Sequence, residues 1–468
     1  MSDVCLKVQD GTHFSPKEQF ATGTYKYITA KNIKTWGLDL SELTYVSEKT
    51  HREIVKRCNP EKGDVLYIKD GVTTGIATIN TLDEEFSLLS SVALLKPRRE
   101  IINPYFLKYY LNSPEGFRNM TGQMTGTAIK RLILQKIKQA WVPVAPLDEQ
   151  HRIVAEIEKQ FTRLDAGVRS LKRVQIALKR YRASVLKAAF EGRLVPTEAE
   201  LARQERRSYE PATKLLARIL KERRAGWEST ELAKLKGTGK APTADNWKTK
   251  YKDPTEPVGR NPELPEGWTW ASLAAIAELK GGLTKGQKRR SGDVLRPVPY
   301  LRVANVQRGY LDLSELKQIE ATADEISILR LQPGDILFNE GGDRDKLGRG
   351  WIWQGEVSEC IHQNHVFRAR LYSDAISPKF VSWYGNSFGQ EYFFAEGKHT
   401  TNLASINLTK LSNFLVPLPP STEQARIIAE VERRLSVIDE MEATAAANLK
   451  RTDRLHQSIL HRAFLGDL

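Results

Sequence analysis

Apolar residues recur every three or four positions through two long stretches of the chain, residues 147–194 and 421–468. That period places the apolar side chains along one side of an α-helix, so each stretch predicts one long helix with an apolar stripe. About 45 residues would give a helix of roughly 65 Å, which exceeds the width of most domains and leaves the stripe in need of a partner. In the first stretch the stripe consists of Ile153, Ile157, Phe161, Leu164, Val168, Leu171, Val174, Leu178, Tyr181, Val185 and Ala189.

The two helical stretches are copies of each other. Matching residues at their starts include Glu149, Gln150 and Arg152 and, 274 positions later, Glu423, Gln424 and Arg426. Each helix is the obvious partner for the other, so we expect an antiparallel two-helix coiled coil within one chain, closing by turns at Gly192 and Gly466. The alternative is two unrelated surface helices. Against it, the residues that are identical in the two stretches are concentrated at the ends, which determine where each helix begins and ends.

The stretches before the helices repeat as well. Both contain short runs of β-forming residues between turn residues, which is typical of a mixed α/β globule. Matching segments are YKYITAKNI at 25–33 and YLRVANV at 300–306, LDLSEL at 38–43 and 311–316, and GDVLY at 63–67 and GDILF at 334–338. The predicted fold class is therefore mixed α/β (α+β), with two tandem globular domains separated by the coiled coil. The expected regions are domain 1 (1–146), helix 1 (147–194), a spacer (195–263), domain 2 (264–420) and helix 2 (421–468).

Two loop regions differ between the copies although their frames match. GVTTGIAT at 71–78 stands where the second copy has GGDRDKLGRG at 341–350, and TGQMTGTAIKR at 121–131 stands where it has GKHTTNLAS at 397–405. Divergent loops on a shared frame suit a protein that reads two different ligands with one scaffold. Neutral drift of surface loops is the alternative explanation.

Two segments have no counterpart in the other copy. The spacer is rich in arginine and predicts a short amphipathic helix after Pro211, followed by a solvated linker over residues 234–265. The second domain opens with LPEGWTW at 264–270, and the counterpart of Trp268 would lie before Met1. We therefore expect the first domain to be shortened at its N-terminus.

Charge is the most informative bulk property. The net charge is +14 and the isoelectric point is about 9.4, which favours a polyanionic partner such as nucleic acid. No apolar run approaches a membrane span and no secretory signal is evident, so the chain is expected in the cytoplasm without a membrane partner. Three widely separated cysteines suggest neither a disulfide framework nor a zinc finger.

Motifs for catalysis are missing from the sequence. It has no GxGxxG opening a helix, no phosphate-binding GxxxxGK loop and no acidic-Pro-Pro-aromatic tetrapeptide, so no catalytic residues are predicted. Cys360, His362 and His365 carry groups that bind zinc, but they lie in a segment that alternates like a strand, where His365 points away from the other two. The first copy has no such ligands, so no metal site is predicted.

Side chains that can address base edges gather in the divergent loops and the nearby turns. Because most loop residues are solvated and most contacts to DNA go to phosphates, only some of these are expected to touch DNA. The candidates are Lys31, Asn32, Lys34, Gln123, Thr125, Thr127, Lys130, Arg131, Asn305, Gln307, Arg308, Arg344, Lys346, Arg349, Lys398, His399, Thr400 and Asn402.

Several of these features together resemble a known family. The chain resembles the specificity subunit of type I restriction-modification systems, with two variable globules and repeated long helices. The motifs that carry the resemblance are LPEGWTW at 264–270, VPLPPSTEQARIIAEVE at 416–432, AFLGDL at 463–468 and the segment Pro-Leu-x-Glu-Gln-x-Arg-Ile at 146–153, which recurs slightly altered at 420–427. The likeness spans nearly the whole chain and departs from the family only in the missing opening of the first domain.

The resemblance implies a subunit without catalysis of its own. Each globule would be a target-recognition domain that reads one half of a split, asymmetric sequence in double-stranded DNA, with the helices as the spacer. Partners would be two methyltransferase subunits that use S-adenosylmethionine, and restriction subunits that use ATP and Mg²⁺ for translocation and cleavage; this chain would bind no cofactor. The alternatives are an unrecognised nuclease or methyltransferase, a specificity subunit of another multisubunit restriction enzyme, or a coiled-coil protein scaffold.

Overall fold

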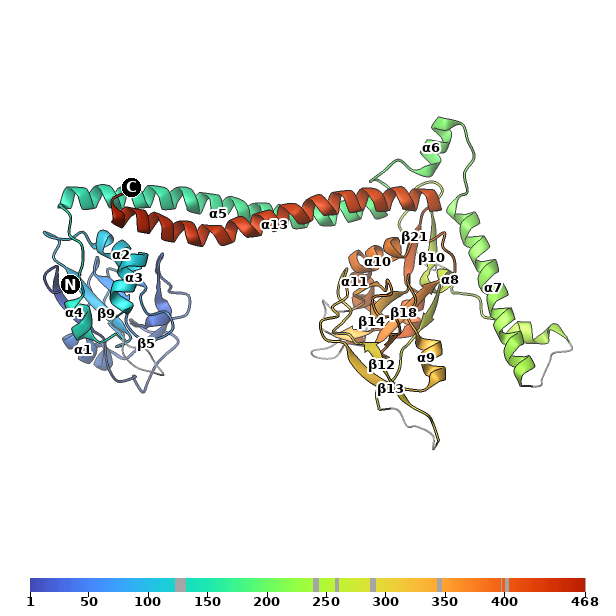
Figure 1. Cartoon of the computed structure of the whole chain (residues 1–468), viewed down its shortest axis with the longest axis horizontal. Helices are drawn as coiled ribbons and strands as arrows, with labels where there is room; N and C mark the ends of the chain where they lie inside the picture. The colour runs from blue at the N-terminus through green and yellow to red at the C-terminus, as the bar shows by residue number, and fades with distance from the viewer. Residues whose placement is uncertain are drawn as a thin grey trace. The chain divides into compact units, whose positions relative to one another are not determined.

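The computed structural model describes residues 1–122, 132–238, 244–256, 261–286, 292–342, 347–396, 398–399 and 404–467, and only the backbone of residues 342, 398, 399 and 404. The chain forms two compact units (Figure 1). Unit 1 comprises Met1–Gln175 and Ala443–Leu468, and unit 2 comprises Ile176–Glu442. None of the described helices is both long enough and apolar enough to cross a membrane.

The globule of unit 1 is built on two sheets. The larger has the order β1-β9-β6-β7 and the smaller β5-β2-β8, in which β2 and β8 run parallel. Its strands are β1 (Cys5–Asp10), β2 (Tyr25–Ile28), β3 (Ile33–Lys34), β4 (Gly37–Leu38), β5 (Thr44–Val46), β6 (Val65–Ile68), β7 (Ala77–Ile79), β8 (Phe86–Leu88) and β9 (Val92–Pro97). Its helices are η1 (Ala30–Asn32), α1 (Glu48–Arg57), α2 (Pro104–Asn112), α3 (Pro114–Thr121) and α4 (Leu134–Gln139).

The globule of unit 2 repeats this topology. Its sheets have the orders β11-β18-β14-β16 and β13-β12-β17, with β12 and β17 parallel. Its strands are β10 (Thr269–Ser272), β11 (Ala277–Lys280), β12 (Arg296–Leu301), β13 (Lys317–Ala321), β14 (Ile336–Asn339), β15 (Gly341–Gly342), β16 (Gly350–Ile352), β17 (Ile361–His362), β18 (Val366–Leu371), β19 (Lys398–His399), β20 (Ala404–Ser405) and β21 (Leu415–Leu418). Its helices are α6 (Glu198–Glu205), α7 (Ala212–Gly237), η2 (Asp245–Lys250), α8 (Leu273–Ile276), α9 (Ala323–Leu329), α10 (Pro378–Ser387), α11 (Gly389–Glu396) and α12 (Leu408–Ser412).

Two long helices, α5 (Leu147–Phe190) and α13 (Ser421–Leu465), each contribute to both units. They end a few residues before the predicted positions because Gly192 and Gly466 adopt left-handed backbone angles, at which the chain leaves the helix. The amide of Arg193 donates to the carbonyl of Ala188, and the amide of Asp467 to that of Arg462, which satisfies the last turn of each helix. The mixed α/β fold with two long helices agrees with the sequence prediction.

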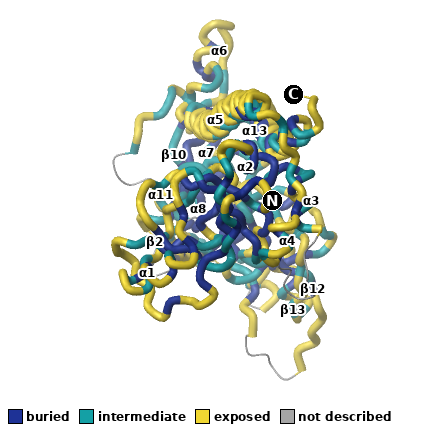
Figure 2. The backbone as a smooth tube through the Cα atoms, turned by 90° about the vertical axis from the view of Figure 1, so that its left-hand side faces the viewer, coloured by how far each residue is buried: buried dark blue, intermediate teal, exposed yellow. Residues whose placement is uncertain are grey.

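The ends of the long helices are the parts that enter the cores. In unit 1, Ile157 of α5 and Leu460 of α13 are buried with side chains of α2, and in unit 2 Phe190 of α5 and Val431 of α13 are buried with those of α10. Along the rest of α5 most residues are exposed (Figure 2). Two members of the predicted stripe, Val174 and Tyr181, are 44% and 47% exposed, so the stripe is not buried along its whole length.

The spacer is more structured than the sequence suggested. The helix expected after Pro211 is α7, and it extends over 26 residues to Gly237, into the stretch interpreted as linker. Beyond it, η2 places the ring of Trp247 6.0 Å from that of Trp227, in a stacked arrangement. Tyr251 also packs against Trp227, at 5.3 Å between ring centroids. These aromatic contacts order part of the predicted linker. The composition of the segment did not predict them.

Candidate nucleic-acid interface

Asn32 and Asn305, both predicted to read bases, instead hold equivalent turns. Asn32 Nδ2 donates to the carbonyls of Asp39 and Glu42, at 3.1 and 3.2 Å. Asn305 Nδ2 donates in the same way to Asp312 and Glu315, at 2.8 and 3.0 Å. The two asparagines are only 5% and 3% exposed, so their amides are committed to the fold and the prediction for them was wrong. The repeated LDLSEL segments supply the carbonyls, which explains their repetition.

The ends of β6 and β14 hold equivalent residues of opposite charge, Lys69 and Glu340. The amide of Lys69 donates to Ser91 and its carbonyl accepts from Leu132. The amide of Glu340 donates to His365 and its carbonyl accepts from Ile406, residues that lie 274 positions after Ser91 and Leu132. One backbone position therefore carries an ammonium group in unit 1 and a carboxylate in unit 2. A sequence signal for this pair exists, because both residues stand two positions after the matched segments GDVLY and GDILF.

In unit 1 the lysine belongs to a charged cluster beside the loop at 71–75. Lys69 Nζ lies 2.7 Å from Asp70 Oδ2 and 3.5 Å from Asp10 Oδ2. Asp10 is buried, and its Oδ1 accepts from Arg57 at 2.8 Å. At the tip of the adjacent loop, Val72 is fully exposed. The cluster is therefore a largely buried ion-pair network next to a loop that differs between the units.

In unit 2 the same region has a different set of groups. Glu340 pairs with Nδ1 of His365, and the imidazole is 54% exposed. Arg349, a predicted DNA-binding residue, turns inward and donates to the carbonyls of Val306 and Val303 at 3.1 and 3.3 Å. A carboxylate accepts hydrogen bonds from the amino group of cytosine, whereas a lysine donates to guanine. The two units thus carry opposite charges at one shared position, but only the Glu340–His365 pair is accessible, because Lys69 is 7% exposed and paired with Asp70 and Asp10.

The remaining candidates fall into three groups. In the first group the side chains are described one by one: Lys31 is exposed and Lys34 is half-buried. The side chain of Gln307 donates to the carbonyl of Ala304, and that of Arg308 donates to the carbonyl of Asn386. Lys398 and His399 form β19, which pairs with β20 next to β15. The others lie outside the described residues: Gln123, Thr125, Thr127, Lys130, Arg131, Arg344, Lys346, Thr400 and Asn402.

Each unit has a cleft between its globule and its long helices, and the two clefts are equivalent. Their volumes are about 670 Å³ in unit 1 and about 620 Å³ in unit 2. Both contain an aromatic ring and an asparagine from the globule and two acidic residues from a long helix. Tyr109, Asn112, Glu158, Phe161, Asp165 and His456 line the first, and the residues 274 positions away, Trp383, Asn386, Glu432, Leu435, Asp439 and Arg182, line the second.

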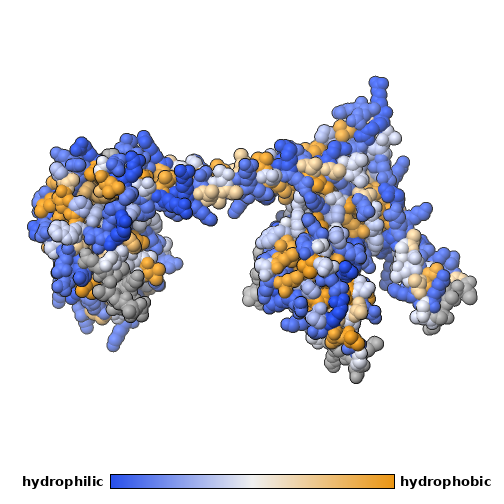
Figure 3. Space-filling view, viewed as in Figure 1, coloured by the Kyte–Doolittle hydropathy of each residue, from blue (hydrophilic) through white to orange (hydrophobic). Residues whose placement is uncertain are grey.

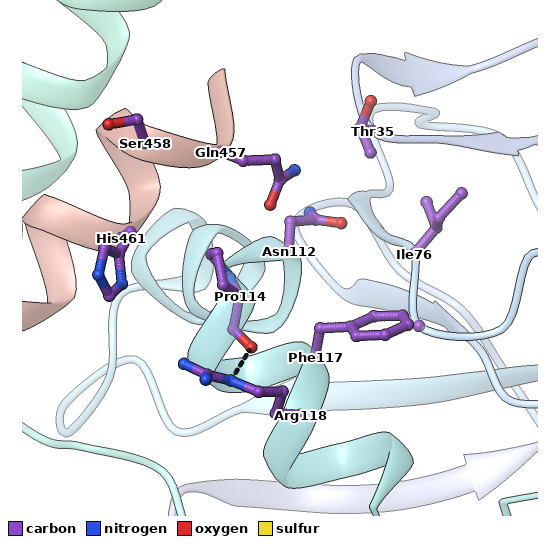
Figure 4. A pocket seen from close by; sticks show the side chains of 10 residues that line it. Thr35, Ile76, Asn112, Pro114, Phe117, Arg118, Gln457, Ser458 and His461 are labelled. Carbon is purple, nitrogen blue, oxygen red and sulfur yellow. Dashed lines mark hydrogen bonds between the residues drawn. The ribbon is translucent and has the colours of Figure 1, made fainter. Parts of the chain in front are cut away.

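A further hollow adjoins the cleft of unit 1 (Figure 4), with a volume of about 790 Å³. Pro114, Phe117 and Arg118 of α3 face Gln457 and His461 of α13 across it. In unit 2, apolar residues gather among polar ones near α10 and α11, the region that holds the second cleft (Figure 3). Both units therefore combine apolar and acidic groups on the side where the long helices meet the globule.

The cysteine and histidines considered for zinc lie in separate environments. Cys360 is buried, and burial raises the pKa of its thiol to about 12. His362 is fully buried with Nδ1 2.7 Å from the carbonyl of Val366, while His365 faces solvent beside Glu340. Within the described ranges no three histidine, cysteine, aspartate or glutamate side chains come together as a metal would require.

His362 makes the stability of unit 2 sensitive to acid. Burial lowers the pKa of His362 to about 4, below its ordinary value of 6.5, so between these pH values the histidine is protonated in the unfolded chain and neutral in the folded chain. The stability that the neutral His362 preserves is fully present above pH 6.5 and is lost as the pH falls toward 4. We expect a loss of about 2 kcal/mol in the free energy of unfolding between pH 7 and pH 5.

Urea denaturation at both pH values measures this loss, and His362→Gln should remove most of the difference. An unchanged pH dependence in that variant would refute the assignment, with His365→Gln as the exposed control.

The comparisons with known proteins agree with this organisation. Residues 1–173 match the family model described as the type I restriction modification DNA specificity domain. The EcoKI specificity subunit of Escherichia coli (strain K12) is 23% identical over 94% of this chain and 82% of its own length. The StySPI specificity subunit of Salmonella potsdam is likewise 23% identical, with the same coverage of both chains.

A solved structure shares the fold along the whole chain. It comes from work on complex assembly and conformational transition of the type I restriction-modification system, with a TM-score of 0.64, 17% identity and coverage of 100% of this chain and 97% of that one. Residues 1–173 therefore match the type I restriction modification DNA specificity domain, and nearly the whole chain is similar in sequence to specificity subunits of type I restriction enzymes and in fold to the solved structure.

Proposed function

We propose that each unit reads one half of a split, asymmetric target in double-stranded DNA. The observation that carries this proposal is a shared strand end that leads into a divergent loop and holds different groups in the two units: a buried, ion-paired Lys69 in unit 1, and Glu340 paired with the exposed His365 in unit 2. Two readers with the same frame would approach DNA in the same way, while different groups at their reading edges would select different bases. The target would therefore have two unlike halves.

The long helices are proposed to act as the spacer between the halves, as an antiparallel coiled coil. Contacts inside each unit support this arrangement. In unit 1 the ring of Phe161 lies 4.8 Å from that of His456, so the early part of α5 meets the late part of α13. In unit 2 Arg182 lies 3.1 Å from Glu442 and also pairs with Asp439, so the late part of α5 meets the early part of α13. A stiff pair of helices would fix the separation of the two half-sites.

The two equivalent clefts are proposed to receive two copies of one partner, the methyltransferase subunit. Repetition of Glu158 and Asp165 as Glu432 and Asp439 gives both clefts the same acidic groups on a long helix. In the proposed complex the methyltransferase subunits use S-adenosylmethionine, restriction subunits use ATP and Mg²⁺, and this chain supplies recognition without catalysis. The same repetition would suit any partner that binds twice.

A map of methylated adenines tests the proposal. DNA from cells that express this chain with its methyltransferase subunit is compared with DNA from cells that express the methyltransferase alone. We expect a split motif with a fixed unspecified spacer only when this chain is present. Methylation that is identical without it would contradict the role in specificity. DNA binding that stays weak and indifferent to sequence with the partner present would favour a protein scaffold.

A further inference from the structure

In unit 2, the carboxylates of the cleft between the globule and the long helices are paired with cations of the same unit. The guanidinium of Arg182 pairs with Asp439, and the ammonium group of Lys379 pairs with Glu432. Arg182 and Arg308 both line this cleft, together with the two carboxylates. The cleft of unit 2 therefore already holds the positive charge that its acidic groups attract.

The cleft of unit 1 keeps the carboxylates and lacks these cations. Glu158 and Asp165 of α5 stand at the positions of the two carboxylates of unit 2, and Asp453 of α13 adds a third. Thr35 precedes its LDLSEL segment by three residues, as Arg308 does. The residues at the positions of Arg182, Lys379 and Arg308 are, in that order, His456, Tyr105 and Thr35.

Within unit 1 these carboxylates have only weak partners. Asp165 lies 3.8 Å from Nε2 of His456, which is charged only when it is protonated. Glu158 accepts from the hydroxyl of Tyr109 at 3.4 Å. Lys108 also lines the cleft, but its Nζ lies 4.3 Å from the centre of the Tyr109 ring and acts on Glu158 through a coulombic interaction. In the part of the chain that the structure describes, none of the three carboxylates forms an ion pair with a lysine or arginine.

Aromatic rings also distinguish the cleft of unit 1. Trp36, in the turn between β3 and β4, lines the cleft and is 71% exposed, where unit 2 has Gly309. Phe161 takes the place of Leu435 and packs edge-on against Tyr109, with 5.7 Å between the ring centroids. Guanidinium groups stack on aromatic faces and bind carboxylates through paired N–H donors. The groups of this cleft therefore suit the kind of cation that unit 2 supplies from its own chain.

We propose that the cleft of unit 1 binds an arginine side chain of the methyltransferase subunit. The guanidinium would donate to Glu158 and Asp165 and stack on the ring of Trp36, and would thus take the part that Arg182 plays in unit 2. This rests on the proposed docking of the methyltransferase subunit at the two clefts, and it names the chemical group that unit 1 receives.

Other ligands fit the cleft of unit 1 less well. Its carboxylates repel phosphate groups, which disfavours DNA. A lysine ammonium group is a strongly hydrated point charge, and it gains less from aromatic rings than a guanidinium does. Because the cleft of unit 2 already holds the guanidinium of Arg182, two copies of one partner would be bound unequally, with an additional contact in unit 1.

The first test uses the full chain without DNA or partner, and N-acetyl-arginine amide as the probe. The NMR signal of the Trp36 indole N–H, identified by its loss in Trp36→Phe, reports binding at the cleft of unit 1. We expect a saturable shift of this signal, with an affinity about tenfold higher than that for the uncharged analogue N-acetyl-citrulline amide. Equal affinities for the two probes, or no shift with either, would overturn the proposed site.

Substitutions in the cleft test which groups hold the probe. His456→Arg supplies the guanidinium that unit 2 has at this position, and it should weaken binding of the probe by about tenfold or more. Asp165→Asn should have a similar effect, because it removes a carboxylate from the site. The matched controls are His151→Arg and Asp148→Asn, at exposed positions of α5 that do not line the cleft, and both should bind the probe normally. Normal binding by His456→Arg and Asp165→Asn would refute the assignment.

The second test asks whether the arginine comes from the methyltransferase subunit. Native mass spectrometry without DNA measures the binding of each of its two copies to the full chain. We expect His456→Arg to weaken one copy by about tenfold and to leave the other unchanged. If both copies bind normally to a variant that has lost the probe, the methyltransferase subunit is not the source of the arginine. Neither test depends on methylation, so a failed site in this cleft would leave the role in specificity to be decided by the map of methylated adenines.

Discussion

Arg370→Ala is expected to lower the free energy of unfolding of unit 2 by about 3 kcal/mol. Arg370 Nε and Nη2 donate to both carboxylate oxygens of Asp335, at 2.7 and 2.8 Å, and Asp335 is only 1% exposed. Without the guanidinium, a buried carboxylate would keep one backbone bond, from the amide of Gln332 at 2.7 Å. The loss is large because the carboxylate stays buried without the guanidinium that binds both of its oxygens, and Arg368 acts on it only through a coulombic interaction.

Calorimetry or hydrogen exchange of the full chain measures this effect, with unit 1 as the internal reference. Arg296→Ala is the matched control, since it removes an arginine from the exposed pair with Glu359 and should cost far less stability than Arg370→Ala. Arg370→Lys should restore part of the stability, because unit 1 has Lys96 at 3.0 Å from Asp64 in the equivalent place. Equal losses for Arg370→Ala and Arg296→Ala would contradict the argument from burial.

Glu340→Ala is expected to relax the choice of base at one position in one half of the target by about tenfold to a hundredfold. The carboxylate lies at the end of β14 beside a divergent loop, and it orients the exposed imidazole of His365. Removing it takes away an acceptor for a base amino group and frees the histidine. The other half and the spacer length should stay the same, because unit 1 has its own residue at this position, Lys69.

Sequencing of methylated adenines in cells that express the variant with the methyltransferase subunit provides the readout. Glu315→Ala is the control, since Glu315 is an exposed acidic residue of the same unit whose carboxylate pairs with Arg302 and Lys317. It should leave the motif intact. If the methylated motif is unchanged by Glu340→Ala, Glu340 does not contact a base. If both halves of the motif change, the substitution disturbs the fold of the chain and not one base contact.

The sequence by itself determined the repeated architecture. Periodic apolar positions and the offset of 274 located both long helices to within four residues, and segments such as LDLSEL at 38–43 and 311–316 located the repeated globules. Such features are local, because helix periodicity and turn residues depend on neighbours in the chain. The same sequence also carries the resemblance to the specificity subunits of type I restriction-modification systems. It did not predict the length of α7, whose far end is packed through Trp227 and Trp247.

Only the tertiary structure decided which polar residues are available to DNA. Asn32, Asn305 and Arg349 have side chains that suit base recognition, yet the carbonyls that they bind lie on turns and strands brought near by folding. Lys69 and Glu340 each stand two residues after the matched segments GDVLY and GDILF, at the same offset of 271, and their equivalent backbone bonds show that they hold one position in the fold. Exposure depends on what the rest of the chain covers, which is also why Glu149 and Glu423, at matching positions of the repeat, differ in burial.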